Sequence, residues 1–182
     1  MRIIGGRFKG RKFYPPADRW PTRPTTDYAK EALFNILHNR FDFASVRFLD
    51  LFGGTGSHCF EMISRGCQDA TYVDQFGPCV RFVRELATEL DVTDYLTIVR
   101  SDVFRFLNKT RGAWDYIFAG PPYALQNIGE IPERVLQGEL LKPGGLLILE
   151  HNHRIAFTDH PCFDELRTYG QCHFSLFKNA GE

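Results

Sequence analysis

The stretch RFLDLFGGTGS, residues 47–57, decides the fold. Its first half is a short apolar run that predicts a buried strand, Arg47 to Leu51. Its second half holds three glycines, which let a chain turn tightly and approach a ligand closely because they carry no Cβ. A strand that passes through such a turn into a helix is the opening unit of an α/β sheet, so this stretch predicts an α/β fold.

Short apolar runs alternate with segments of helical periodicity after residue 57. This alternation is typical of a parallel sheet with crossover helices. The further strands are predicted at 70–73, 97–99, 116–119 and 146–150, and the helices at 57–65, 77–90, 103–108 and 129–137. Two apolar runs near 163–169 and 172–177 predict an antiparallel pair at one edge. The predicted fold class is a doubly wound, seven-stranded, mostly parallel sheet of the Rossmann-like type.

The first 25 residues differ from the rest of the chain in their sequence pattern and in their charge. Short runs at 2–4 and 12–14 flank several glycines and predict a small β-hairpin. Prolines then impose an extended connection, and Thr25, Thr26 and Asp27 offer N-caps for a helix that ends near His38. We therefore divide the chain into a basic N-terminal hairpin or arm, residues 1–25, and a single compact body, residues 26–182.

This arm holds seven basic residues against one acid, although the whole chain has 22 of each sign. Lysine and arginine side chains bind nucleic acids by neutralising phosphates and releasing counterions. A solvated basic ribbon is the alternative, and the charge run by itself does not separate the two. The candidate RNA-contacting residues are Arg2, Arg7, Lys9, Arg11, Lys12, Arg23 and Thr25.

Composition narrows the class of protein further. The chain has 182 residues, of which 43% are hydrophobic and 24% charged, as expected of one globular domain. Its apolar runs are too short to cross a bilayer, and its N-terminus lacks the apolar core of a signal peptide. Five cysteines without a CxxC pair indicate reduced thiols, so we expect a cytoplasmic protein. The histidines and cysteines near residues 151–173 lack regular ligand spacing, and we expect no metal.

Acidic residues follow the first three predicted strands, at the edge where sheets of this type bind ligands. Asp50 precedes the glycine turn, Asp74 is placed to bind the hydroxyls of a ribose, and Asp102 is placed to accept from an adenine amino group. A turn role for Asp74 and a helix cap for Asp102 are the alternatives. The candidate cofactor-contacting residues are Asp50, Gly54, Gly56, Asp74, Asp102 and Val103.

The glycine turn matches the dinucleotide fingerprint G-x-G-x-x-G at only two positions, because Cys59 occupies the third. The turn and the three acids together predict a pocket for adenosine, with the first acid placed for an amino-acid moiety. That combination fits S-adenosylmethionine better than a dinucleotide that carries a pyrophosphate.

The fourth predicted strand leads into Gly120, Pro121, Pro122 and Tyr123, the candidate catalytic residues. Adjacent prolines fix the backbone and lack N–H donors, so carbonyl oxygens remain as acceptors. Tyr123 is suited to stack on an extruded nucleobase, a contact worth about 1–3 kcal/mol. Acceptors that bind the amino protons of that base aim its nitrogen at the sulfonium methyl of S-adenosylmethionine. Catalysis is then by positioning and electrostatics. A rigid loop without chemistry is the alternative.

Five stretches, in this order, resemble the bacterial 16S rRNA guanine-N2 methyltransferase family. They are RIIGG at 2–6, TRPTTD at 22–27, DLFGGTG at 50–56, SRG at 64–66 and PPY at 121–123. The resemblance spans nearly the whole chain, and RPTTD is its specific part. The glycine turn is shared by many class I methyltransferases, and Pro-Pro-Tyr by several groups that methylate amines.

The resemblance implies a class I methyltransferase fold, S-adenosylmethionine as donor, and a guanine of 16S rRNA, free or in the assembling small subunit, as target. It assigns the methionine part to the turn at Asp50, the ribose to Asp74, the adenine to Asp102 and catalysis to residues 120–123. No obligate protein partner is implied. An amino-directed DNA methyltransferase and a non-catalytic binder of S-adenosylmethionine or RNA are the alternative functions.

Two residues depart from the family pattern. Cys59 replaces a glycine, with little expected effect. Gly120 stands where the family has an aspartate whose carboxylate is one of two acceptors for the target amine. A backbone carbonyl, a water molecule and Glu150 are the candidate substitutes for that carboxylate.

Overall fold

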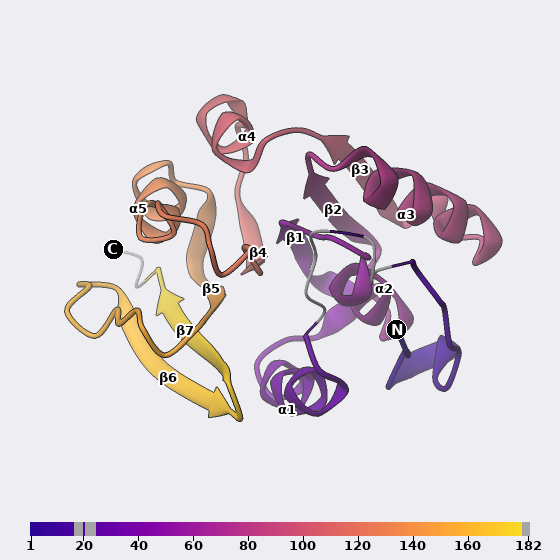
Figure 1. The fold of residues 1–182 in the computed structure, drawn as a ribbon, viewed down its shortest axis with the longest axis horizontal. Coiled ribbons are helices and arrows are strands. Elements are labelled where there is room, and N and C mark those ends of the chain that lie inside the picture. Colours follow the sequence, from indigo (N-terminus) through magenta and orange to yellow (C-terminus); the bar gives the residue numbers. More distant parts are fainter. Residues whose placement is uncertain (17–19, 21–24, 180–182) are drawn as a thin grey trace.

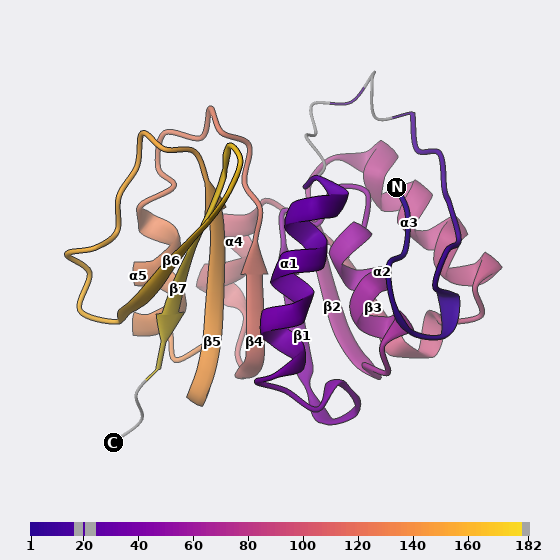
Figure 2. The same ribbon diagram turned by 90° about the horizontal axis from the view of Figure 1, so that it is seen from below.

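The computed structural model describes residues 1–16, 20 and 25–179, and its central feature is an open seven-stranded sheet (Figures 1 and 2). The strand order is β3-β2-β1-β4-β5-β7-β6. The parallel strands are β1 (Arg47–Leu51), β2 (Asp69–Asp74), β3 (Leu96–Arg100), β4 (Trp114–Ala119) and β5 (Leu141–His151). The antiparallel strands at one edge are β6 (Phe163–Tyr169) and β7 (Cys172–Lys178).

Helices cover both faces of the sheet (Figure 1). One face packs against α1 (Asp27–His38), α2 (Ser57–Ser64) and α3 (Gly77–Glu89). The opposite face packs against α4 (Val103–Lys109) and α5 (Glu130–Gln137). Three short 3-10 turns, η1 (Gly6–Phe8), η3 (Phe43–Ser45) and η4 (Thr93–Tyr95), complete the described elements.

The core lies in two layers, one on each side of the sheet. Along β1, Phe48 enters the layer under α1 to α3, whereas Leu49 enters the layer under α4 and α5. Along β4, Tyr116 enters the layer under α1 to α3 and Ile117 enters the layer under α4 and α5. Strands buried on both faces read as continuous apolar runs, which is why these segments were predictable as strands of a covered parallel sheet.

The predicted strands, helices and edge hairpin of the body are confirmed. The predicted cap is also present, because the Thr26 hydroxyl accepts from the Ala29 amide at 3.2 Å. Strand β5 is longer than predicted and begins at Leu141, which pairs with Trp114 across an irregularity in the ladder. Gly144 and Gly145, which precede the predicted strand, lie within the observed one.

The predicted N-terminal hairpin is present as a short antiparallel pairing. The Ile3 amide donates to the Arg11 carbonyl at 3.0 Å and the Phe13 amide to the Met1 carbonyl at 2.9 Å, on either side of the bridge between Arg2 and Lys12, and residues 6–8 form η1 in the connection. The amides of Ile4 and Gly5 donate to the two carboxylate oxygens of Glu61 in α2, each at 2.8 Å, instead of to a partner strand. The hairpin is therefore short, and it docks on α2 through the amides of Ile4 and Gly5.

Among the residues that the structure describes, no helix combines the length and the apolar character that a bilayer span requires.

Candidate active site

An open cavity of about 300 Å³ lies at the carboxyl ends of the parallel strands. Strands β1, β2, β4 and β5 contribute residues at or just after their ends. Thr25 before α1, the start of α2 and the start of α4 complete the wall. The predicted residues that line it are Thr25, Asp50, Gly54, Asp74, Val103, Gly120, Pro121, Pro122 and Tyr123. Gly56 and Asp102 are not among its lining residues. The structure therefore brings the predicted donor turn and the predicted catalytic turn to one cavity.

The glycine turn between β1 and α2 is held tightly by its neighbours. A Cβ at Gly53 would lie 2.4 Å from the Tyr72 ring, and the Tyr72 hydroxyl donates to the Gly54 carbonyl at 2.7 Å. Gly56 has φ +73° and begins α2, which explains why glycine stands there. Gly56 thus shapes the turn from outside the cavity wall.

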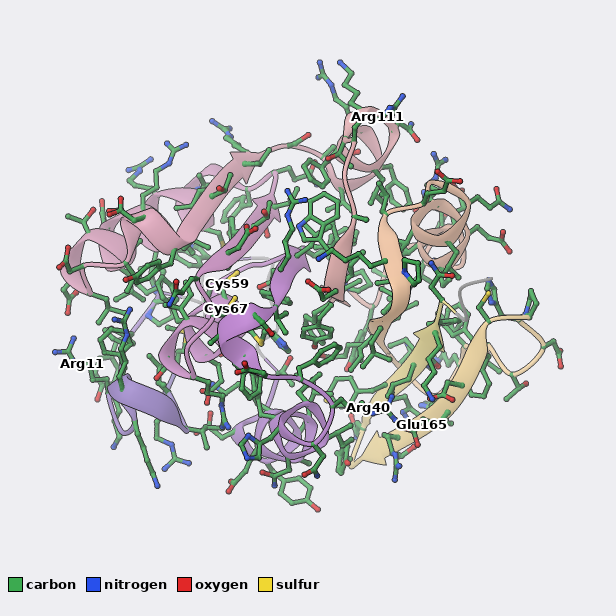
Figure 3. The ribbon with its side chains drawn as sticks, turned by 180° about the vertical axis from the view of Figure 1, so that it is seen from behind. Arg11, Arg40, Cys59, Cys67, Arg111 and Glu165 are labelled. Atoms are coloured by element: carbon green, nitrogen blue, oxygen red, sulfur yellow. The ribbon has the colours of Figure 1, made fainter. Side chains whose placement is uncertain are left out.

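Asp50 is buried at the end of β1, with 1% of its surface exposed. The Cys59 thiol donates to its Oδ2 at 3.3 Å, and Figure 3 shows Cys59 deep inside the molecule. Burial raises the pKa of Asp50 to about 7. Cys59, which the sequence marked as a minor departure from the family, is therefore in direct contact with the acid of the predicted methionine site.

Asp74 joins the glycine turn to the next loop. Its Oδ2 accepts from the Gly54 amide at 2.9 Å, and its Oδ1 accepts from the Phe76 amide at 2.8 Å. Burial raises the pKa of Asp74, and the backbone amides partly oppose that shift. The same carboxylate lines the cavity, so it combines the predicted turn role with a position suited to a ligand.

Asp102 is exposed and caps α4, where its carboxylate accepts from the Arg105 amide at 2.9 Å. The neighbouring Val103 lines the cavity and Asp102 does not. The capping alternative is therefore present in the structure, and the adenine contact of Asp102 stays a prediction.

Glu150, at the end of β5, connects three segments of the cavity wall. Its Oε2 accepts from the Thr25 hydroxyl at 2.6 Å, and its Oε1 accepts from the Tyr123 hydroxyl at 3.2 Å. Only 6% of its surface is exposed. The residue before α1 and the aromatic ring of the predicted catalytic turn are thus attached to one buried carboxyl group.

Gly120 leaves its part of the wall without a side chain. Its amide donates to the Leu51 carbonyl at 3.2 Å, which ties the turn to β1. A Cβ at this position would lie 3.2 Å from the Phe118 ring, closer than ordinary contact distance. Phe118 therefore borders the space in which a larger residue at 120 would begin.

His58 is a lining residue that sequence reasoning missed. Its Nε2 lies 2.9 Å from the Tyr116 hydroxyl, and its ring stacks on Phe118 at 4.1 Å between centroids. Burial lowers the pKa of His58 well below its usual range, so the ring is neutral. Its place in the first turn of α2, directly after the glycine turn, was the available signal.

The basic arm lies beside α2, with its cations directed to solvent. Arg2, Arg7, Lys9, Arg11 and Lys12 are exposed, and Arg11 extends outward in Figure 3. Arg7 and Arg11 both lie over the Phe8 ring, at 4.5 and 5.5 Å from its centroid. Arg23, the remaining predicted cation of this group, falls outside the described residues.

All five cysteines are free. In residues 1–16, 20 and 25–179, no three or more His, Cys, Asp or Glu side chains form a group that is able to hold a metal ion.

Solved structures define the class. The chain superposes on a structure titled "Putative methyltransferase yhhF" from Escherichia coli with a TM-score of 0.86, 24% identity and coverage of 100% of this chain and 99% of that one. An RNA methyltransferase from Salinibacter ruber in complex with S-adenosyl-L-homocysteine gives a TM-score of 0.67 at 12% identity, over 88% of this chain and 95% of that one. The fold is that of the class I methyltransferases, as the sequence predicted.

The family follows from sequence comparison. A family model described as "Conserved hypothetical protein 95" matches residues 1–178, so the chain belongs to that family. "Putative rRNA methyltransferase YlbH" of Bacillus subtilis is 30% identical over the whole of both chains. "Ribosomal RNA small subunit methyltransferase D" of Escherichia coli K12 is 32% identical over 68% of this chain and 60% of its own length. The predicted family is confirmed, and with it S-adenosylmethionine as the methyl donor that the family uses.

Proposed function

We propose that this protein methylates the exocyclic N2 amino group of a guanine in 16S rRNA, with S-adenosylmethionine as donor. The observation that carries the proposal is the shared cavity, in which Asp50, Gly54 and Asp74 face the same space as Pro121, Pro122 and Tyr123. A ribosomal RNA substrate also agrees with the names of the relatives and with a cytoplasmic location.

The donor side of the cavity has the groups that S-adenosylmethionine needs. Asp50 supplies a buried carboxylate for a cationic amino group, and Asp74 supplies oxygens for ribose hydroxyls. The glycine turn allows close approach to the backbone. Val103 supplies an apolar contact for the adenine ring. We also propose Asp102 and Gly56 as donor-site residues, because Asp102 precedes the helix that begins at Val103 and Gly56 shapes the glycine turn. When bound, the donor supplies an electrophilic methyl group.

The acceptor side has the groups that an extruded base needs. Tyr123 offers an aromatic face, and the carbonyls of the Gly120 to Pro122 turn are acceptors for the amino group. The prolines hold that turn rigid, so the amine is oriented before reaction. His58 and Phe118, stacked beside Gly120, provide an apolar wall.

The basic arm supplies affinity for the RNA backbone. Exposed cations at 2, 7, 9, 11 and 12 are suited to phosphates, and Thr25 connects the end of the arm to the cavity. The division into an arm of residues 1–25 and a catalytic body of 26–182 stays part of this proposal.

Methyl transfer from labelled S-adenosylmethionine tests the function. The substrates are unmethylated 16S rRNA, small subunits that contain it, and duplex DNA, and the labelled nucleoside is identified after digestion. We expect N2-methylguanosine from RNA or subunits and no label in DNA. Label in another base, or in DNA, contradicts the proposal.

A pair of variants links that activity to the cavity. Asp74→Asn removes the charge of a lining carboxylate and should lower donor affinity by about tenfold or more. Asp91→Asn makes the same chemical change on the surface, at a φ of 55° that asparagine tolerates, and serves as the control. Equal affinity in the two variants would exclude Asp74 from the donor site.

A further inference from the structure

We propose that Glu150 is the carboxylate that accepts the proton of the target amine during methyl transfer. This assignment rests on the proposed function and names a catalytic residue for it. Gly120 has no side chain, so the turn at the end of β4 offers the amine only backbone carbonyls.

The chemistry requires a proton acceptor close to the amine. The amine nitrogen forms a bond to the methyl carbon while the carbon–sulfur bond breaks, and the electron pair of that bond stays on sulfur. The nitrogen is left with a positive charge and one proton too many. That proton passes to a base, and a nearby carboxylate also stabilises the developing charge.

Three carboxyl groups line the described part of the cavity, at Asp50, Asp74 and Glu150. Asp50 lies at the end of β1 against the Cys59 thiol, and Asp74 accepts from two amides of the donor-side loops. Glu150 is the member of this set that contacts the predicted catalytic turn, through the Tyr123 hydroxyl. Its position therefore matches the acceptor side of the cavity.

The sheet register brings Glu150 beside Gly120. Strands β4 and β5 are parallel, and Ala119 is paired with Leu149, so residues 120 and 150 follow as neighbours. Phe118 and Ile148, two positions earlier, both enter the core layer under α1 to α3. Because side chains alternate along strands, residues 120 and 150 share that same face. A carboxylate at 150 thus lies on the side of the sheet to which a side chain at 120 would point.

The surroundings hold this carboxylate in one orientation. Thr25 donates to its Oε2, and Tyr123 and the Cys172 thiol donate to its Oε1, at 3.2 and 3.6 Å. These hydrogen bonds orient the Glu150 carboxylate within the cavity that it lines. A group fixed before reaction avoids the cost of reorganisation during it.

Single-turnover methyl transfer with saturating donor and RNA tests the assignment. Glu150→Gln should slow the chemical step by about 10²-fold or more, the usual contribution of a general base, while donor affinity stays within about threefold. Glu139→Gln, an exposed matched change two residues after α5, should leave the rate unchanged. Glu150→Ala should be as slow as Glu150→Gln, because both lack the carboxylate.

A relocated carboxylate is the most specific test. Adding Gly120→Asp to Glu150→Gln should restore the rate by about tenfold, since it returns an acceptor to the same face of the neighbouring strand. A double variant that binds the donor normally and stays as slow as Glu150→Gln counts against the assignment.

The outcomes separate this inference from the function on which it rests. An active wild-type enzyme with Glu150→Gln within about threefold of its rate overturns the role of Glu150 and leaves the function standing. If Glu150→Gln reacts near the wild-type rate and Glu150→Ala is slow, Glu150 only positions Thr25 and Tyr123. That result also overturns the assignment of Glu150 as the proton acceptor. A wild-type protein that binds the donor but methylates no RNA overturns both.

Discussion

At the scale of single residues, burial of Asp50 has a consequence for donor binding. Because burial raises its pKa to about 7, Asp50 is mostly protonated in the free protein at pH 6. A cationic amino group stabilises the ionised form, so binding below pH 7 should release a proton. We expect donor affinity to rise with pH up to about 7, by at most about tenfold per unit, and then to level off.

Calorimetry in buffers of different ionisation enthalpy measures this proton release. Asp50→Asn should abolish the release and flatten the pH dependence, whereas Asp91→Asn should change neither. A proton count of zero at pH 6 in the wild type would mean that Asp50 is already ionised there.

Gly120→Asp by itself should bring little gain in rate, within about threefold, if Glu150 already supplies a carboxylate. The new Cβ would also lie 3.2 Å from the Phe118 ring, so that ring must shift. Single-turnover assays of the variant decide the point. A gain of about tenfold or more would identify the missing side chain at 120 as the limiting group.

At the scale of elements, the arm is attached to α1 and α2 by a buried ion pair. Lys30 donates to the Arg2 carbonyl at 2.6 Å and to Ser57, and it lies 3.7 Å from Glu61, whose carboxylate binds the arm amides. Both side chains are buried. Burial lowers the pKa of Lys30, and the charge of Glu61 opposes that shift.

Lys30→Met should destabilise the fold by about 1–3 kcal/mol, because it breaks the buried pair with Glu61 and leaves the Arg2 carbonyl without its donor, while Arg65 stays paired with Glu61 at 2.9 Å. The arm should then become more sensitive to protease. Urea denaturation and limited proteolysis measure the two effects. Adding Glu61→Gln to Lys30→Met should cost further stability, because Glu61 also pairs with Arg65 and accepts from both arm amides. The exposed control Lys9→Met should change stability by less than about 0.5 kcal/mol. A stable single variant with a protected arm would show that the pair does not anchor it.

At the scale of the whole molecule, the charge asymmetry predicts where RNA binds. Replacing Arg7, Lys9 and Arg11 with glutamine should weaken RNA binding and reduce the slope of log affinity against log salt by about 0.7 for each lost phosphate contact. Donor affinity should not change, because none of the three lines the cavity.

The control variant replaces three exposed cations elsewhere with glutamine, so that it loses the same charge. These residues are Lys109, Arg111 and Arg154. In Figure 3 Arg111 lies at the top of the molecule and Arg11 at its left edge. Filter binding across a range of salt concentrations compares the two triple variants. Equal slopes would show that the arm has no special part in RNA binding.

The sequence by itself determined the order of strands and helices along the chain, the covered parallel sheet and half of the residues that line the cavity. These features depend on local periodicity, on glycines and prolines with few allowed conformations, and on the rule that parallel strands end at one edge. Asp50, Asp74 and Tyr123 were predictable because each follows a recognisable strand. The start of β5 was not, because it depends on the pairing of Leu141 with Trp114 in β4.

Only the tertiary structure decided which side chains meet. Thr25 and Glu150 are 125 residues apart in the chain, and Glu61 binds the arm across 56 and 57 residues. The docking of the N-terminal hairpin on Glu61 had no signal in the local sequence. Such pairings depend on how buried polar groups find partners once the helices are packed on the sheet, and no local pattern of residues encodes that choice.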